Sequence, residues 1–204
     1  MAESALLVDP TQSVFINCPY DAEFAPLFDA IVFATVCCGF VPRSALESGN
    51  VAEPRMERIT RAIFSSKYSI HDLSRCKGEG SEQLARFNMP LELGIAIARR
   101  YTQTDEAHQH DWLLLVPEGN EYKRYVSDLA GIDPKCHDGT VASIVPKTMS
   151  WLKTRPDAVE TPNPPEVLAA LPSFAQAKAA LAQAWNNDIP WGDILLAAKE
   201  HVPE

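Results

Sequence analysis

The chain has 204 residues, a net charge of −9 at pH 7 and a pI near 5.0. Such an acidic surface repels phosphodiester backbones and argues against a nucleic-acid partner, although a local positive pocket could still bind a mononucleotide. The first 12 residues lack the basic and apolar regions of a signal peptide, and no stretch approaches the roughly 20 apolar residues that cross a bilayer. We therefore expect a cytoplasmic protein without a membrane partner.

The apolar share of 46 % is ordinary for a globular protein and predicts a well-formed core. The sequence has five cysteines, two of them adjacent, and no Cys-x-x-Cys pair. Neither a disulfide framework nor a zinc site fits this spacing, and His108, His110 and His137 lack regular ligand spacing. We expect reduced, mostly buried thiols and no metal.

Segments with the character of strands and helices alternate along the chain. An apolar run at 14–16 predicts a buried first strand, and apolar residues at helical spacing over 24–35 predict a helix that ends at Gly39. The further expected elements are a strand over 40–46, a helix with Met56, Ile59 and Ile63 inward and Arg55, Arg58 and Arg61 outward, a strand over 68–74, a loop over 76–86, a helix over 88–101, a strand over 112–116, and helices over 120–131 and 141–153.

This alternation predicts an α/β fold with a doubly wound, mostly parallel, flavodoxin-like sheet over residues 1–154. Residues 155–165 contain four prolines and no periodicity, which predicts a linker. Residues 166–204 carry two apolar stripes at helical spacing and predict a helical extension. Two such short helices need a surface to pack on, so we expect contact with the main domain or a homo-oligomer through this tail.

Ligands of open parallel sheets bind beyond the carboxyl ends of the strands, near the point where the strand order reverses. This rule selects the polar residues that follow each predicted strand and that open the next helix. The candidate binding residues are Asn17, Tyr20, Asp21, Arg43, Asp72, Ser74, Arg86 and Asn88. Glu92 lies one helical turn after Asn88 on the same face and is the candidate catalytic residue.

Three motifs carry a family resemblance: Cys-Pro-Tyr-Asp at 18–21, His-Asp-Leu-Ser at 71–74, and Asn-Met-Pro-Leu-Glu-Leu-Gly-Ile-Ala-Ile-Ala at 88–98. Their order and spacing over residues 13–116 resemble the nucleoside 2-deoxyribosyltransferase and TIR-like superfamily. The resemblance implies cleavage of N-glycosidic bonds in nucleosides, nucleotides or NAD, with Glu92 as the catalytic glutamate and Asp72 and Asn88 in the pocket. It also implies NAD or a nucleotide as substrate, no further cofactor, and for some bacterial members a role in antiviral defence.

The chemistry of a carboxylate suits this reaction, because it can stabilise the oxocarbenium-like cation that forms when the glycosidic bond breaks. Structural explanations compete for single residues. Glu92 could simply interact with the positive end of the helix dipole, Asn88 could cap the helix, and Asp72 could stabilise a turn. His71 and Cys18 could be packing residues without a chemical role. The alternative function is a non-catalytic nucleotide sensor or a TIR-type assembly module.

Overall fold

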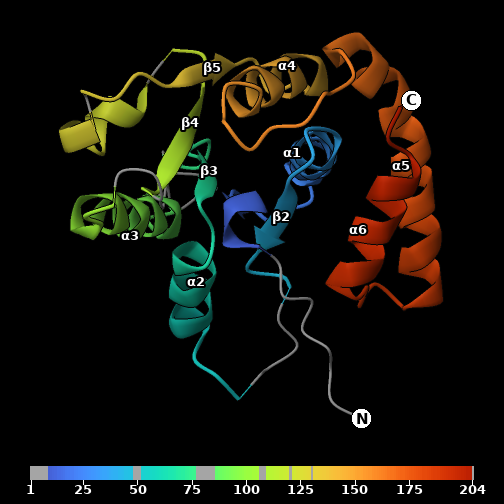
Figure 1. Cartoon of the computed structure of the whole chain (residues 1–204), viewed down its shortest axis with the longest axis horizontal. Helices are drawn as coiled ribbons and strands as arrows, with labels where there is room; N and C mark the ends of the chain where they lie inside the picture. Colours follow the sequence, from blue (N-terminus) through green and yellow to red (C-terminus); the bar gives the residue numbers. More distant parts are fainter. Residues whose placement is uncertain are drawn as a thin grey trace, which may run out of the picture.

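The computed structural model describes residues 9–47, 52–76, 86–105, 109–119, 121–129 and 131–203. Its centre is a five-stranded sheet in the order β2-β1-β3-β4-β5, and every paired strand is parallel to its neighbour (Figure 1). The strands are β1 (Ser13–Asn17), β2 (Val41–Ser44), β3 (Tyr68–Asp72), β4 (Asp111–Pro117) and β5 (Lys135–His137). The predicted doubly wound α/β fold is confirmed, and the strand order reverses between β1 and β3.

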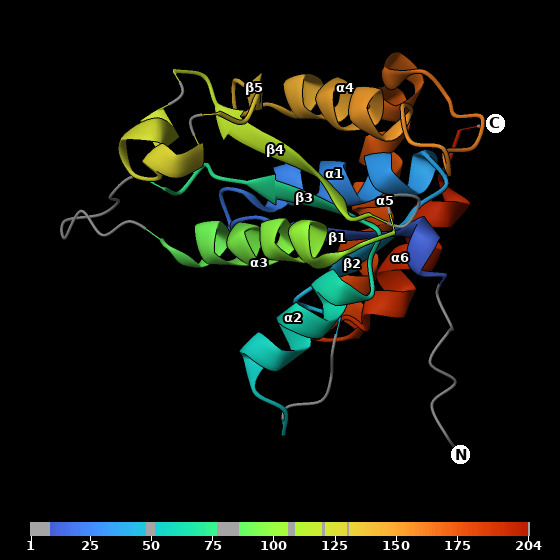
Figure 2. The same ribbon diagram turned by 60° about the vertical axis from the view of Figure 1, so that its left-hand side comes forward.

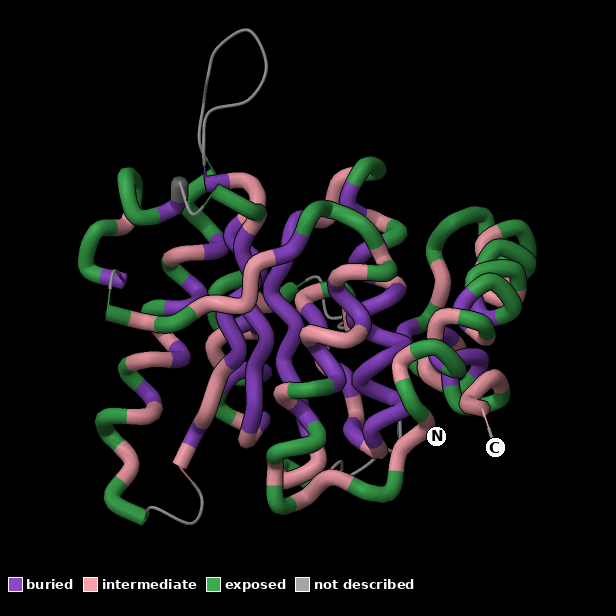
Figure 3. Tube along the Cα trace, turned by 90° about the horizontal axis from the view of Figure 1, so that it is seen from above, coloured by how far each residue is buried: buried purple, intermediate pink, exposed green. Residues whose placement is uncertain are grey.

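Helices cover both faces of the sheet (Figure 2). On one face, α1 (Ala25–Cys37) and α4 (Val141–Leu152) pack against Val14 and Ile16 of β1. On the other, α2 (Arg55–Phe64) packs against Phe15 of the same strand, and α3 (Asn88–Thr102) lies beside α2. Side chains alternate between the two faces of a strand, which is why consecutive residues of β1 enter different parts of the core. Figure 3 shows the resulting buried layer along the strands.

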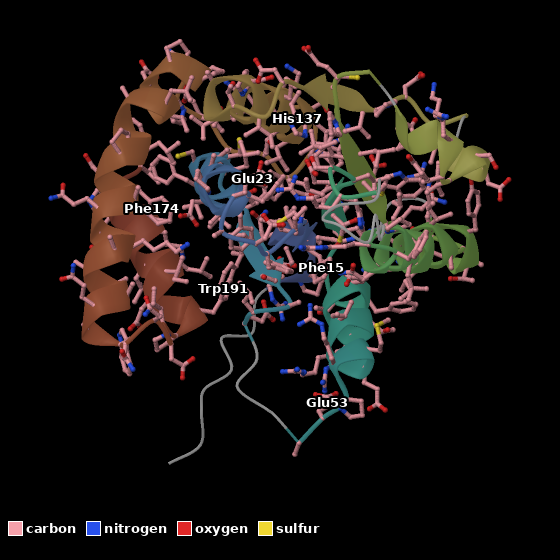
Figure 4. All side chains as sticks on the ribbon, turned by 180° about the vertical axis from the view of Figure 1, so that it is seen from behind. Phe15, Glu23, Glu53, His137, Phe174 and Trp191 are labelled. Atoms are coloured by element: carbon pink, nitrogen blue, oxygen red, sulfur yellow. The ribbon has the colours of Figure 1, made fainter. Side chains whose placement is uncertain are left out.

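The helical tail packs on the main domain of the same chain. It consists of α5 (Pro164–Ala184) and α6 (Trp191–Glu200). Phe174 of α5 is fully buried and stacks on Phe33 of α1 with ring centroids 5.1 Å apart. Trp191 of α6 is also buried, and its indole Nε1–H donates to the backbone oxygen of Pro42 at 3.1 Å (Figure 4).

Residues 155–165, predicted as a linker, differ from that expectation at both ends. The Asp157 carboxylate accepts hydrogen bonds from Lys67 Nζ at 2.8 Å and from the Tyr68 hydroxyl at 2.5 Å, which ties the segment to the start of β3. Helix α5 begins at Pro164, where Asn163 and Glu166 form a capping box. Proline is favoured in the first turn of a helix, so prolines that suggested a linker in fact open the helix.

Two further expectations between β4 and α4 were wrong. Residues 120–131 do not form one helix, since the structure has the short 3-10 turns η3 (Glu121–Arg124) and η4 (Ser127–Leu129) there. Strand β5, only three residues long, was missed because so short a run shows no periodicity.

In α2, Met56 was expected to face inward but is 41 % exposed, whereas Ile59 and Ile63 are buried as predicted. None of the helices in the described ranges has the length and apolar character needed to cross a membrane.

Candidate functional site

Glu92 occupies an apolar position on α3, close to the carboxyl end of β1. Its residue surface is 2 % exposed, and within the described part of the chain its Oε2 atom is buried without a hydrogen-bond partner. Burial raises the pKa of this carboxyl group to about 7, and the Arg55 guanidinium on α2 offsets part of that rise. A buried polar atom normally finds a partner, so an unpaired carboxyl oxygen has a cost in stability and makes Glu92 a candidate for a functional role.

This raised pKa predicts an unusual dependence of stability on pH. The unfolded chain ionises Glu92 near its ordinary pKa of 4.5 and the folded protein near 7, so the folded state binds the proton more tightly. The resulting stabilisation is complete below about pH 4.5 and is lost as the pH rises to about 7, a change of about 3 kcal/mol.

Denaturant unfolding of the wild type and of Glu92→Gln at several pH values measures this change. The free energy of unfolding of the wild type, minus that of the variant, should fall by about 3 kcal/mol between about pH 4 and pH 8. Taking the difference cancels the carboxylates that titrate alike in both proteins. The exposed Glu57 on α2 provides the matched substitution Glu57→Gln, which makes the same change from carboxyl to amide at a surface position. Parallel curves for wild type and Glu92→Gln would contradict the raised pKa.

Asp72, at the end of β3, is fully buried and already paired. Its Oδ1 atom accepts the backbone N–H of Ser74 at 2.8 Å, and its Oδ2 atom lies 2.9 Å from Nε2 of His137 on β5. Because Nδ1 of His137 accepts the backbone N–H of Gly139 at 3.2 Å, the imidazole proton is on Nε2 and points to Asp72. Asp72 therefore joins the ends of β3 and β5, and sequence reasoning missed His137 as its partner.

Ser74, His137 and Asp72 resemble the members of a hydrolytic triad, but their geometry is different. The Ser74 hydroxyl lies 3.4 Å from Nε2 of His137, the same nitrogen that donates to Asp72. A triad needs one ring nitrogen for the serine and the other for the carboxylate. Here Nε2 serves both and Nδ1 is occupied by backbone, so this cluster does not activate Ser74 as a nucleophile.

Asp21 and Arg86 were both predicted to bind ligand, and the structure brings them together in one ion-pair cluster. Arg75 contacts the Asp21 carboxylate at 3.1 and 3.2 Å, and Arg86 contacts it at 3.2 Å. Hydrogen bonding to Arg75 lowers the pKa of Asp21, so this carboxylate stays ionised. Arg86 keeps 46 % of its side-chain surface exposed and retains donors for a ligand.

The other predicted binding residues vary in how available they are. The Tyr20 hydroxyl contacts Ile16 O at 3.1 Å and Ser44 Oγ at 3.2 Å, and burial raises its pKa. Arg43 is paired with Glu47 four residues later. Asn88 is exposed and is the first residue of α3, while the N-cap position expected for it is held by Phe87.

Cys18 directly follows β1, and both Asp72 and Glu92 are close enough to affect the ionisation of its thiol. Burial raises the pKa of its thiol well above the usual value, and the nearby Asp72 and Glu92 raise it further. A thiol held neutral in this way is a poor nucleophile, which supports its interpretation as a packing residue. The same interactions place Asp72, Cys18 and Glu92 at one end of the sheet.

Two adjoining cavities open at the carboxyl ends of β3, β4 and β5. The larger has a volume of about 390 Å³ and is lined by Ser74, Arg75, His137 and residues of the neighbouring loops, including Glu23 (Figure 4). The smaller, of about 140 Å³, is lined by Ser74, Tyr122, Tyr125 and their neighbours. Both include Glu118, and neither includes Glu92. Of the predicted binding residues, these cavities therefore receive Ser74 alone.

Comparison with known proteins adds no assignment, because the sequence matches none of the family models searched and none of the curated proteins. Within the described ranges, no three His, Cys, Asp or Glu side chains gather in a way that could hold a metal ion.

Proposed function

We propose that the chain cleaves the N-glycosidic bond of NAD or another nucleotide, with Glu92 as the catalytic residue. The observation that carries the proposal is the buried, unpaired carboxyl oxygen of Glu92 near the end of β1. Its pKa of about 7 means that both the acid and the carboxylate are populated near neutral pH. The carboxylate would stabilise the cationic sugar in the transition state, or orient a ribose hydroxyl or water for attack.

One basic side chain near this carboxyl group, and a second one just before α3, support a phosphate-bearing substrate. Arg55 of α2 is exposed and close enough to Glu92 to affect its ionisation, and Arg86 is half-exposed just before α3. Guanidinium groups bind phosphate through paired N–H donors. A local basic region of this kind would let an anionic nucleotide approach a protein whose net charge is −9.

Incubation with NAD and a panel of ribo- and deoxynucleotides, followed by chromatography for free base, tests the proposal. We expect release of nicotinamide or a nucleobase from at least one substrate. The rate should follow the ionisation of a group with a pKa near 7. If no substrate releases its base, even at protein concentrations at which the chain is oligomeric, the enzymatic proposal is wrong.

One observation favours a non-catalytic alternative, in which the domain binds a nucleotide as a sensor or assembly module. Glu92 is 2 % exposed, and the two cavities at the strand ends lie away from it. A catalytic carboxyl must reach its substrate, whereas a sensor needs only a binding surface. Nucleotide binding in a calorimeter without any turnover would favour the sensor.

The proposed setting is the cytoplasm, a reducing compartment that fits a chain whose cysteines are mostly buried. For a homo-oligomer, we propose the outer surface of the tail, because its inner surface is covered by the main domain. Trp185 and Leu196 remain 48 % and 59 % exposed there. Light scattering of Leu196→Asp against the wild type tests this surface, and an equal mass for both proteins would argue against it.

A further inference from the structure

A chain of buried polar side chains lies on the sheet face covered by α2 and α3. It consists of Asn17, His71, Ser69 and His110, each no more than 1 % exposed. Asn17 Nδ2 lies 2.9 Å from His71 Nδ1, His71 Nε2 lies 2.8 Å from Ser69 Oγ, and Ser69 Oγ lies 2.8 Å from His110 Nε2. The parallel register places Asn17 beside His71, and Ser69 two residues earlier on the same face.

The direction of each proton in this chain follows from the contacts at its two ends. Asn17 Nδ2 also donates to the backbone oxygen of Met89 at 2.9 Å, and the opposite amide orientation would set two oxygens against each other. The second proton of Nδ2 then goes to His71 Nδ1, so the ring proton of His71 is on Nε2. His71 therefore donates to the Ser69 hydroxyl. That hydroxyl donates to His110 Nε2, because the other ring nitrogen of His110 faces the backbone oxygen of Ser66 and must carry the ring proton.

The chain ends on backbone at the amino-terminal ends of β3 and β4. With Nε2 accepting from Ser69, the proton of His110 is on Nδ1, and it donates to the backbone oxygen of Ser66 at 2.9 Å. Arg99, near the end of α3, donates from Nη1 to that same oxygen and to the backbone oxygen of Ile63. These two bonds use both protons of Nη1, so His110 Nδ1, which lies 3.3 Å from it, can still carry its own proton. The hydrogen bonds thus hold α3 near both ends, by Asn17 in its first turn and by Arg99 in its last part.

Met89, whose carbonyl oxygen receives the Asn17 amide, is three residues before Glu92, within one turn of the helix. We propose that Asn17 is a positioning residue for Glu92 and that His71, Ser69 and His110 fix the orientation of its amide. This inference rests on the proposed function of Glu92 and revises the expected ligand-binding role of Asn17. Both amide protons of Asn17 are used inside the protein, where they hold the helix that carries the carboxyl group.

Both imidazoles in the chain must stay neutral, since each one accepts a hydrogen bond at one nitrogen and donates from the other. Burial lowers the pKa of His71 to about 3 and that of His110 to about 4. The nearby Arg99 adds to the effect at His110. The order of protons is therefore retained across the neutral pH range in which Glu92 titrates.

Long-range ¹⁵N spectra of the histidine rings in the full chain test the chain directly, without any enzymatic activity. We expect the Nε2–H tautomer for His71 and the Nδ1–H tautomer for His110. The reverse tautomer at His71 would mean that Asn17 presents its oxygen to the ring, and the proposal would fail.

A second test follows the Glu92 carboxyl carbon by ¹³C titration in Asn17→Leu, which has a similar volume and no donors. Loosening the first turn of α3 should hydrate Glu92 and lower its pKa by about 1 or more. Ser69→Ala interrupts the chain of hydrogen bonds at a point more distant from Glu92, so it should lower the Glu92 pKa by a smaller amount. This variant tests the proposal if Asn17→Leu does not fold. The matched control is Ser65→Ala, because within the described ranges the Ser65 hydroxyl bonds the Ala62 oxygen of its own helix and no member of the chain. Unchanged Glu92 titration in both chain variants would overturn the proposal.

These readouts separate the proposal from the enzymatic one. If Glu92→Gln keeps full turnover, Glu92 is not the catalytic residue. The histidine tautomers and the Glu92 titration still decide whether Asn17 positions Glu92. If turnover depends on Glu92, Asn17→Leu should reduce kcat and leave KM nearly unchanged. A raised KM with unchanged kcat would instead show that Asn17 binds substrate, as the sequence first suggested.

Discussion

Replacing Glu92 by glutamine should reduce the rate of base release by roughly a hundredfold to ten-thousandfold, the usual contribution of a positioned acid, base or charge. Glutamine keeps the size of the side chain and removes both the negative charge and the ionisation near pH 7. Since the carboxyl group is buried and its Oε2 atom is unpaired, the substitution should leave the fold intact and should raise stability at neutral pH. Loss of turnover with equal or higher stability is the expected signature.

Glu118 offers the matched control for this experiment. It is an exposed carboxylate that lines both cavities at the ends of β3–β5, where the sheet topology alone would place a ligand. Glu118→Gln should retain most of the wild-type rate if the chemistry takes place at Glu92. The opposite result, with Glu118→Gln inactive and Glu92→Gln active, would move the active site to the cavities and refute the assignment from family resemblance.

Much of the fold could be predicted from the sequence, because its elements have the periodicity that their burial requires. Helices α1 and α3 and strands β1, β3 and β4 lie close to their expected ranges. Where the expectation failed, a local signal was weak or ambiguous. Strand β5 has three residues, and the prolines near 164 suit a linker and a helix start equally well.

The site was predicted less completely, since sequence shows which residues follow a strand but not what they contact. The apolar residues around Glu92 in the sequence of α3 indicate burial, and burial raises the pKa of its carboxyl group. Asn17 and Asp72 were placed at the correct strand ends, yet their hydrogen-bond groups are used by Met89, His71 and His137. Contacts of this kind join residues 54 to 72 positions apart, and only the packed structure reveals them.

Phe174→Ala should lower the free energy of unfolding by about 3–5 kcal/mol, the typical loss for a large buried aromatic side chain. Phe174 is fully buried between α5 and α1 and stacks on Phe33 at an interplanar angle of 9°. The substitution would leave a cavity that the surrounding helices cannot close. The matched control is Phe64→Ala on α2, because Phe64 is 51 % exposed and its removal should cost under about 1 kcal/mol.

Denaturant unfolding of both variants, followed by helical and tryptophan signals together, decides whether the tail belongs to the cooperative unit. A single shifted transition for Phe174→Ala shows that α5 and α6 unfold with the sheet, as their packing on α1 requires. An unshifted main transition, preceded by an early loss of helix, would show that the tail is a separate appendage. Base release per folded molecule should be unchanged in Phe174→Ala, because the tail packs on the face covered by α1 and Glu92 lies on α3 at the opposite face.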